Sequence, residues 1–65
     1  MKCHIESHGN NFYAVKKNDS GQVLASAMGL DTEEQAIKII RERWKHKGSI
    51  KIFVEGTAKR VIDAL

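Results

Sequence analysis

The stretch DTEEQAIKIIRERWKHKGSIKIFVEG, residues 31–56, decides the fold that we expect for this chain. Its first half spaces apolar residues as one stripe of a helix, and its second half alternates apolar and polar residues as a strand does. A helix of this kind followed by a strand needs a sheet on which both can bury their apolar sides. The helical stripe, which we expect in the core, consists of Ala36, Ile37, Ile40 and Trp44.

The ends of this helix are marked by short polar signals. Asp31 is a good N-cap residue, and Glu34 three positions later completes a capping-box pattern. Thr32 with Gln35 gives the same signal one residue later. Gly48 is predicted to end the helix, because glycine readily adopts the left-handed conformation that closes many helices.

Three strands are predicted before the helix. Residues 2–7 alternate between a face with Cys3 and Ile5 and a polar face. Residues 12–17 are rich in β-prone side chains, and residues 22–28 form a weaker third strand. Turn-forming residues at 18–21 join the second strand to the third.

The clearest strand, residues 50–55, follows the helix. Its alternation turns one set toward the helix and the other away from it, the first being Ile50, Ile52 and Val54 and the second Lys51, Phe53 and Glu55. In the tail, residues 57–65, three apolar residues fall at helical spacing and predict a short C-terminal helix.

The expected architecture is therefore a single two-layer α+β domain over residues 1–65. A β-β-β-α-β core covers residues 1–56, with one main helix on one face of a small antiparallel sheet. Residues 57–65 are the tail or short helix. The strand after the helix is free to pair in either direction with an earlier strand.

Length and composition bound the class of protein. The chain has 65 residues, enough for one small domain that is marginal in stability and gains from a partner. Its one cysteine, Cys3, excludes an internal disulfide, which favours a reducing compartment such as the cytoplasm. No apolar run of about 18 residues is present, so we expect no membrane span. The first residues also lack the apolar core of a signal peptide.

The motif pattern resembles a family of small bacterial and phage domains of unknown function. The matching pieces are YAV at 13–15, ASA at 25–27, TEEQA at 32–36 and IKIFVEG at 50–56. The family usually has tryptophan where Tyr13 stands, and a second turn with a short final strand where this chain continues TAKR. A weaker likeness, through GQVLAS at 21–26, is to the YegP-like family. These motifs describe packing and turns, so the resemblance implies the fold and no reaction.

Catalytic motifs are missing from the sequence. It has no Walker loop, no GxGxxG and no CxxC. Cys3 and His4 lie on opposite faces of the first strand, so they do not form a nucleophile–base pair. The acidic residues sit at turns and helix starts, where capping explains them. We therefore expect no enzyme, no cofactor and no small-molecule substrate.

The leading functional hypothesis is a binding module that acts through a protein–protein surface, with a homodimer as one form. One helix covers only one face of a sheet, and both faces of the predicted sheet are partly apolar, so something should cover the other face. We expect that surface to combine the outer sheet face with the tail. Its predicted residues are Phe12, Lys51, Phe53, Val61, Ile62 and Leu65.

The alternative hypothesis is nucleic-acid binding by a basic segment. Residues 41–51 contain five bases and one acid, a net charge of +4 in a chain whose net charge is +3. The simpler explanation is that acids open the helix and bases close it, as the helix dipole favours. The functional explanation is an anionic partner. Its predicted contacts are Arg41, Lys45, Lys47 and Lys51.

A third pattern, on the first strand, is His4, Glu6 and His8. Residues at i, i+2 and i+4 of a strand share a face, and two of the three could reach one metal ion. A solvated strand face explains the same pattern more simply. We therefore assign no metal site from the sequence.

Overall fold

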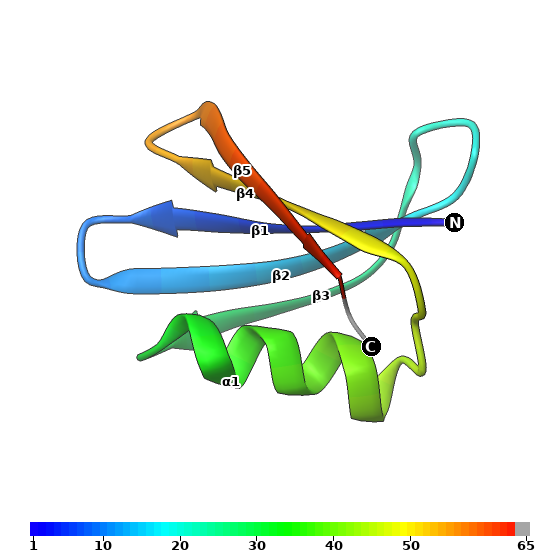
Figure 1. Cartoon of the computed structure of the whole chain (residues 1–65), viewed down its shortest axis with the longest axis horizontal. Coiled ribbons are helices and arrows are strands. Elements are labelled where there is room, and N and C mark those ends of the chain that lie inside the picture. Colours follow the sequence, from blue (N-terminus) through cyan, green and yellow to red (C-terminus); the bar gives the residue numbers. More distant parts are fainter. Residues whose placement is uncertain (64–65) are drawn as a thin grey trace.

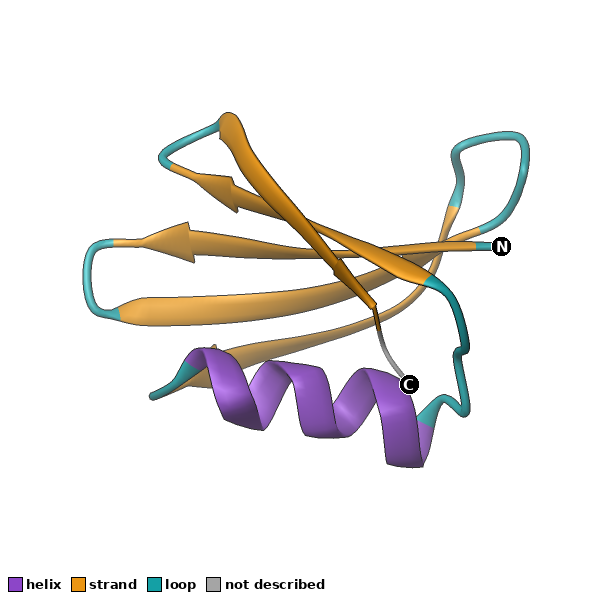
Figure 2. Ribbon diagram, viewed as in Figure 1, coloured by secondary structure: helices purple, strands orange, loops and turns teal. Residues whose placement is uncertain are grey.

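The structure, a computed structural model, describes residues 1–63 as five strands and one helical segment (Figure 1). The strands form one sheet in the order β3-β2-β1-β4-β5, and the helix packs along one face of it (Figure 2). None of the described helices is long and apolar enough to cross a membrane. The elements in chain order are β1 (Lys2–His8), β2 (Asn11–Lys17), β3 (Val23–Leu30), α1 (Glu33–Lys38), η1 (Ile39–Arg43), β4 (Ser49–Val54) and β5 (Thr57–Asp63).

The sheet is mixed, so the prediction of an antiparallel sheet is wrong in one pairing. β4 lies parallel to β1, while β1–β2, β2–β3 and β4–β5 are antiparallel. The first two hairpins occupy both sides of β2, which leaves the outer edge of β1 free. The chain reaches that edge by crossing one face of the sheet through the helix (Figure 1). Such a crossover delivers a parallel strand.

The predicted C-terminal helix is also wrong, because residues 57–63 form β5. Glu55 and Gly56 both have positive φ, 49° and 83°, and they join β4 to β5 as a two-residue turn. Positive φ at both central positions is the conformation of a type I′ turn, which suits the twist of a hairpin. The neighbouring pair Val61 and Ile62 fits a strand with one side chain on each face as well as it fits a helix.

The core lies between the helix and the face of the sheet that it packs on, here called the covered face. The helical stripe and the inward residues of β4 are confirmed as core, except that Val54 is 38% exposed at the strand end. Trp44 packs against this cluster as expected. The buried cluster consists of Cys3, Ile5, Ala14, Ala36, Ile40, Ile50 and Ile52.

The helix begins at the second of the two predicted caps. Thr32 is the N-cap, and its Oγ1 accepts a hydrogen bond from the Gln35 backbone N–H (3.2 Å). Gln35 Oε1 in turn accepts from the backbone N–H of Asp31 (2.9 Å), so Asp31 lies before the cap. The Thr32 side chain thus satisfies the backbone N–H of Gln35, and the Gln35 side chain satisfies the backbone N–H of Asp31.

The helix ends before Gly48, which corrects the predicted C-terminus. Its last turns widen into the π-helical segment η1, where Trp44 N–H donates to Ile39 O (3.0 Å). Lys45, with φ of 53°, then takes the left-handed position expected for Gly48. Because the widened turn closes the helix early, residues 46–48 form a loop that runs to the start of β4.

Candidate functional site

The second face of the sheet carries no helix among the described residues, and we call it the uncovered face (Figure 2). Strand alternation assigns its members, because residues paired across strands share a face. The pairings Lys2–Lys17 and His4–Lys51 belong to it. Its other members near the centre are Glu6, Tyr13, Val15, Phe53 and Val61.

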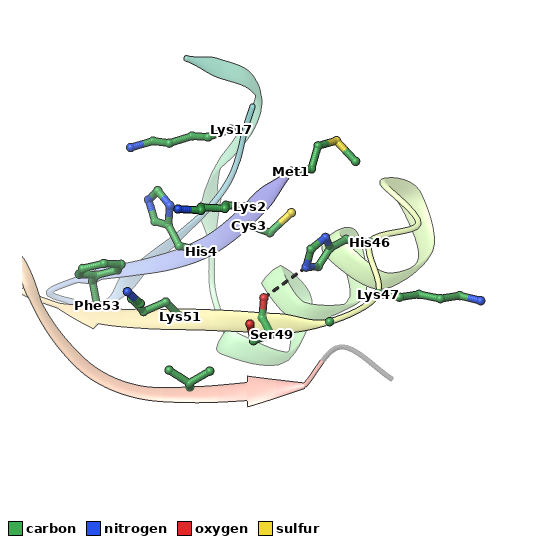
Figure 3. A pocket seen from close by; sticks show the side chains of 12 residues that line it. Met1, Lys2, Cys3, His4, Lys17, His46, Lys47, Ser49, Lys51 and Phe53 are labelled. Carbon is green, nitrogen blue, oxygen red and sulfur yellow. Dashed lines mark hydrogen bonds between the residues drawn. The ribbon is translucent and has the colours of Figure 1, made fainter. Parts of the chain in front are cut away.

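A hollow of about 570 Å³ lies where β1 and β4 begin and β2 ends. Among the described residues 1–63, its lining includes four lysines and two histidines and no carboxylate (Figure 3). The hollow is therefore a concentration of positive charge and hydrogen-bond donors, the environment that an anion seeks. The charged and polar lining comprises Lys2, His4, Lys17, His46, Lys47, Ser49 and Lys51.

Three of these lysines come together through strand pairing. Lys2 and Lys17 are direct cross-strand partners, and Lys51 pairs with His4, the second residue after Lys2 on the same face. Like charges placed directly opposite one another destabilise a sheet by a few tenths of a kcal/mol or more, roughly up to 1 kcal/mol. A bound anion would relieve that repulsion. Lys47 comes instead from the loop after the helix and extends away from the other three (Figure 3).

Phe53 supplies an aromatic surface beside the lysines. It lies on β4 two residues after Lys51, it is half-buried, and it lines the hollow. Its ring meets the His4 imidazole edge to face, with 5.3 Å between ring centroids and 75° between planes. The contact packs the phenyl ring against the imidazole, a favourable arrangement for an aromatic pair.

The far wall of the hollow is built by the loop between η1 and β4. His46 is 9% exposed, and its Nε2–H donates to the carbonyl oxygen of Ser49 (3.2 Å; Figure 3). This bond ties the loop to the start of β4. Cys3 also lines the hollow, and burial raises the pKa of its thiol, so it stays protonated and a poor nucleophile.

The cluster of His4, Glu6 and His8 forms hydrogen bonds within itself. Glu6 Oε2 accepts from His4 Nε2 (3.1 Å), and Glu6 Oε1 lies 3.5 Å from His8 Nε2. The hydrogen bond from His4 holds the pKa of Glu6 below its ordinary value of 4.5, and His8 adds to this effect. Within residues 1–63, no three histidine, cysteine or acidic side chains are grouped so as to hold a metal ion. The carboxylate therefore orders the two imidazoles.

The structure divides the predicted protein surface between the two faces. Lys51, Phe53 and Val61 lie on the uncovered face as expected. Phe12 and Ile62 lie on the covered face and pack against the core, so both assignments are wrong. Phe12 follows the strand phase of Ala14, which is fully buried opposite Ile5, and Ile62 pairs with buried Ile50. Leu65 lies outside the described residues.

The predicted basic segment does not form one surface. Arg41 lies on the outer side of the helix beside Glu34 and Glu42, far in the fold from the sheet's uncovered face. Lys45 occupies the left-handed position after the helix. Only Lys47 and Lys51 reach the hollow. Lys16, another basic residue on β2, lies on the covered face with its ammonium 5.9 Å from the Trp44 ring centroid.

Sequence reasoning missed Lys2 and Lys17 as site residues. They belong to different strands, and their local sequence marks neither as functional. The available signal was the hairpin register, because a turn at residues 9–10 places residue 2 opposite residue 17. Counting back from that turn would have paired the two lysines.

Comparison with protein-family models, curated proteins and solved structures finds no match to this chain.

Proposed function

We propose that this protein is a small non-enzymatic binding module whose uncovered sheet face binds single-stranded nucleic acid. One observation carries the proposal: four lysines and Phe53 line the hollow, and no carboxylate from the described part of the chain does so. Lysines neutralise phosphates, and an aromatic ring on a sheet offers a surface on which a base stacks. A single strand presents both groups at once, whereas the bases of a duplex are stacked on each other.

Electrostatics at the rest of the face support the same ligand. Glu6 accepts hydrogen bonds from His4 and His8, so its negative charge is partly compensated on this face. The end of the face nearest Lys2 and Lys17 is therefore the favourable one for a phosphate.

Protein binding is the second candidate. The interface expected from the sequence loses apolar area on this face, because Phe12 and Ile62 turn to the covered face. The exposed apolar residues that favour a protein partner lie on β3 instead.

We also propose a cytoplasmic location, since Cys3 is a buried free thiol and the chain has no second cysteine.

Fluorescence anisotropy of a labelled oligothymidylate and of a duplex, between about 50 mM and about 200 mM salt, tests the proposal. The variant Lys17→Gln/Lys51→Gln removes two charges from the site. Each lost phosphate contact should lower the slope of log affinity against log salt by about 0.7 for a single strand, so we expect a decrease of about 1.4. The single strand should bind more tightly than the duplex.

The matched control is Lys38→Gln/Arg41→Gln, which removes the same charge from the outer side of the helix. It should leave the slope close to that of the wild type. An equal loss in both variants would mean that net charge alone drives binding. Absence of binding at the lower salt would reject nucleic acid as the ligand.

A further inference from the structure

The two edges of the sheet differ in charge. β5 forms one edge and carries Lys59, Arg60 and Asp63, while β3 forms the other and carries no charged residue from Val23 to Leu30. An edge strand presents unpaired backbone N–H and C=O groups that a further strand can pair with, and charged side chains oppose such pairing. Among the described residues β3 pairs only with β2, so its outer edge is both open and uncharged.

Exposed apolar side chains also gather on β3. Of the six large hydrophobic residues exposed in the described chain, three belong to this strand. Val23 is 58% exposed, Leu24 51% and Met28 68%. Apolar residues on an open strand edge mark a site of association.

The register between β3 and β2 marks a regularly paired segment in the middle of this edge strand. Its pairing with β2 is regular from Ala25 to Ala27 and shifts on both sides of that segment. The extra residues at the shifts bend the strand ends and confine straight pairing to the middle. Ser26 is the middle residue, and Leu24 and Met28 lie two positions on either side of it. Leu24 and Met28 are therefore placed symmetrically about Ser26, while the position that matches Val23 is Gly29.

We propose that β3 pairs antiparallel with β3 of a second copy of this chain, about a two-fold axis at Ser26. Leu24 and Met28 lie at the two register shifts and flank the regularly paired segment. Within that segment, Ser26 lies opposite the partner subunit's Ser26, and Ala25 lies opposite the partner subunit's Ala27. Because the axis repeats the pair, two such apolar contacts form, and direct cross-strand pairs of this kind stabilise a sheet. A second copy fits better than a foreign strand for two reasons. The spacing of Leu24, Ser26 and Met28 is the same when the strand is read in the reverse direction, and β3 carries no charge that would face a like charge on the partner strand.

This pairing joins two five-stranded sheets into one. The two-fold axis that relates two antiparallel edge strands runs perpendicular to the sheet. Both uncovered faces therefore lie on the same side of the dimer. The dimer rests on the edge alone and does not depend on nucleic-acid binding. A strand-edge contact buries less area than a standard interface, so we expect a concentration-dependent dimer rather than an obligate one.

Sedimentation velocity of the wild type over a dilution series, beside Ser26→Lys, tests the pairing. Ser26 is exposed, so the substitution leaves the core intact, but it places two ammonium groups opposite each other at the axis. We expect the dimer dissociation constant to rise by about tenfold or more. The matched control Val61→Lys adds the same charge at a similarly exposed position on the other edge strand and should leave the constant unchanged.

A charge exchange makes the test specific. An equimolar mixture of Ser26→Lys and Ser26→Asp should recover a heterodimer of near wild-type affinity, while each variant alone is mainly monomeric. A wild type that stays monomeric at every concentration would overturn the proposal. So would dissociation by Val61→Lys instead of Ser26→Lys, or a mixture that remains monomeric.

Amide hydrogen exchange of the wild type gives a readout that needs no variant. Raising the protein concentration should slow exchange of β3 amides that do not bond to β2 and leave β5 unchanged. The opposite pattern, with β5 protected and β3 unchanged, would place the interface at the other edge and reject this one.

Discussion

The two faces of the sheet are made by the same strands and have opposite chemistry. On the covered face, Ile5, Ala14 and Ile50 are fully buried beneath the helix. On the uncovered face, the pairings Lys2–Lys17 and His4–Lys51 carry charge and hydrogen-bonding groups. Because a strand sends alternate side chains to opposite sides, the seven residues of β1 contribute to the core on one face and to the binding surface on the other. A domain this small concentrates its core on one face, and among the described residues no helix covers the other.

Burial on the uncovered face has a different origin. Val15 is only 9% exposed there although no described helix lies over it. It is paired with His4 on β1 and with Ser26 on β3, so it lies between two strands in the interior of the sheet. A position in the interior of the sheet is therefore buried even where no described helix covers it.

The largest expected effect is on the covered face. Ile5→Ala removes a fully buried side chain from the central strand, and such truncations cost about 2–5 kcal/mol of the free energy of unfolding. In a domain of this size that is a large share of the total stability. Urea denaturation followed by circular dichroism measures it.

The matched change on the uncovered face is Val61→Ala. Val61 is 58% exposed, so the substitution should change the free energy of unfolding by roughly 0.5 kcal/mol or less. Equal losses from Ile5→Ala and Val61→Ala would mean that the uncovered face is covered in solution and that the contrast between the faces is false.

An intermediate effect is expected at Phe53, where the variant Phe53→Leu removes the ring but keeps an apolar side chain. If a base stacks on this ring, the affinity for a single strand should fall by about 1–3 kcal/mol. The stability should change by less, roughly 1.5 kcal/mol at most, as for volume-conserving apolar substitutions. Anisotropy and urea denaturation of the same preparation separate the two. A loss of stability with no loss of affinity would assign Phe53 to packing alone.

The smallest effect is the pH dependence of Glu6. Its pKa is lowered in the folded state, mainly by the hydrogen bond from His4, so the unfolded chain binds the proton more readily. The stability that Glu6 contributes is therefore present above its ordinary pKa of 4.5 and is lost as the pH falls through the lowered value. The Glu6 side chain is 34% exposed, so solvent screens the effect.

Denaturation midpoints measured from about pH 6 down to about pH 3 should fall less steeply for Glu6→Gln than for the wild type. The difference should shrink at high salt, which screens the charged form of the cluster. Parallel curves for the two proteins would show that the hydrogen bonds of Glu6 add nothing to stability.

Much of the fold could be predicted from the sequence because local periodicity reports burial. The helical stripe of Ala36, Ile40 and Trp44 and the alternation around Ile50 and Ile52 were correctly assigned to the core. The phase of β2 was ambiguous, since Phe12 and Tyr13 are both apolar enough to face inward. The buried neighbour Ala14 decides it in favour of Phe12.

The candidate site was predictable only in part. Lys47, Lys51 and Phe53 were named from the sequence, and all three line the hollow. Arg41 and Lys45 belong to the same charged run as Lys47 but do not line the hollow. Arg41 lies on the outer side of the helix, and Lys45 lies where the helix ends. A run of like charges along a chain does not predict a patch in space, because helix periodicity and turns redistribute its members.

The sequence by itself determined most of the residues buried on the helix and on β4, and the turn at residues 18–21, since those depend on neighbours a few residues apart. Only the tertiary structure decided that β4 lies parallel to β1, that the tail pairs as β5, and that Lys2, Lys17 and Lys51 meet. The parallel pairing and the position of Lys51 depend on contacts between residues far apart in the chain, and the other contacts depend on strand register across the turns. Their free energy comes from strand pairing and shared burial, which no local pattern of residues encodes.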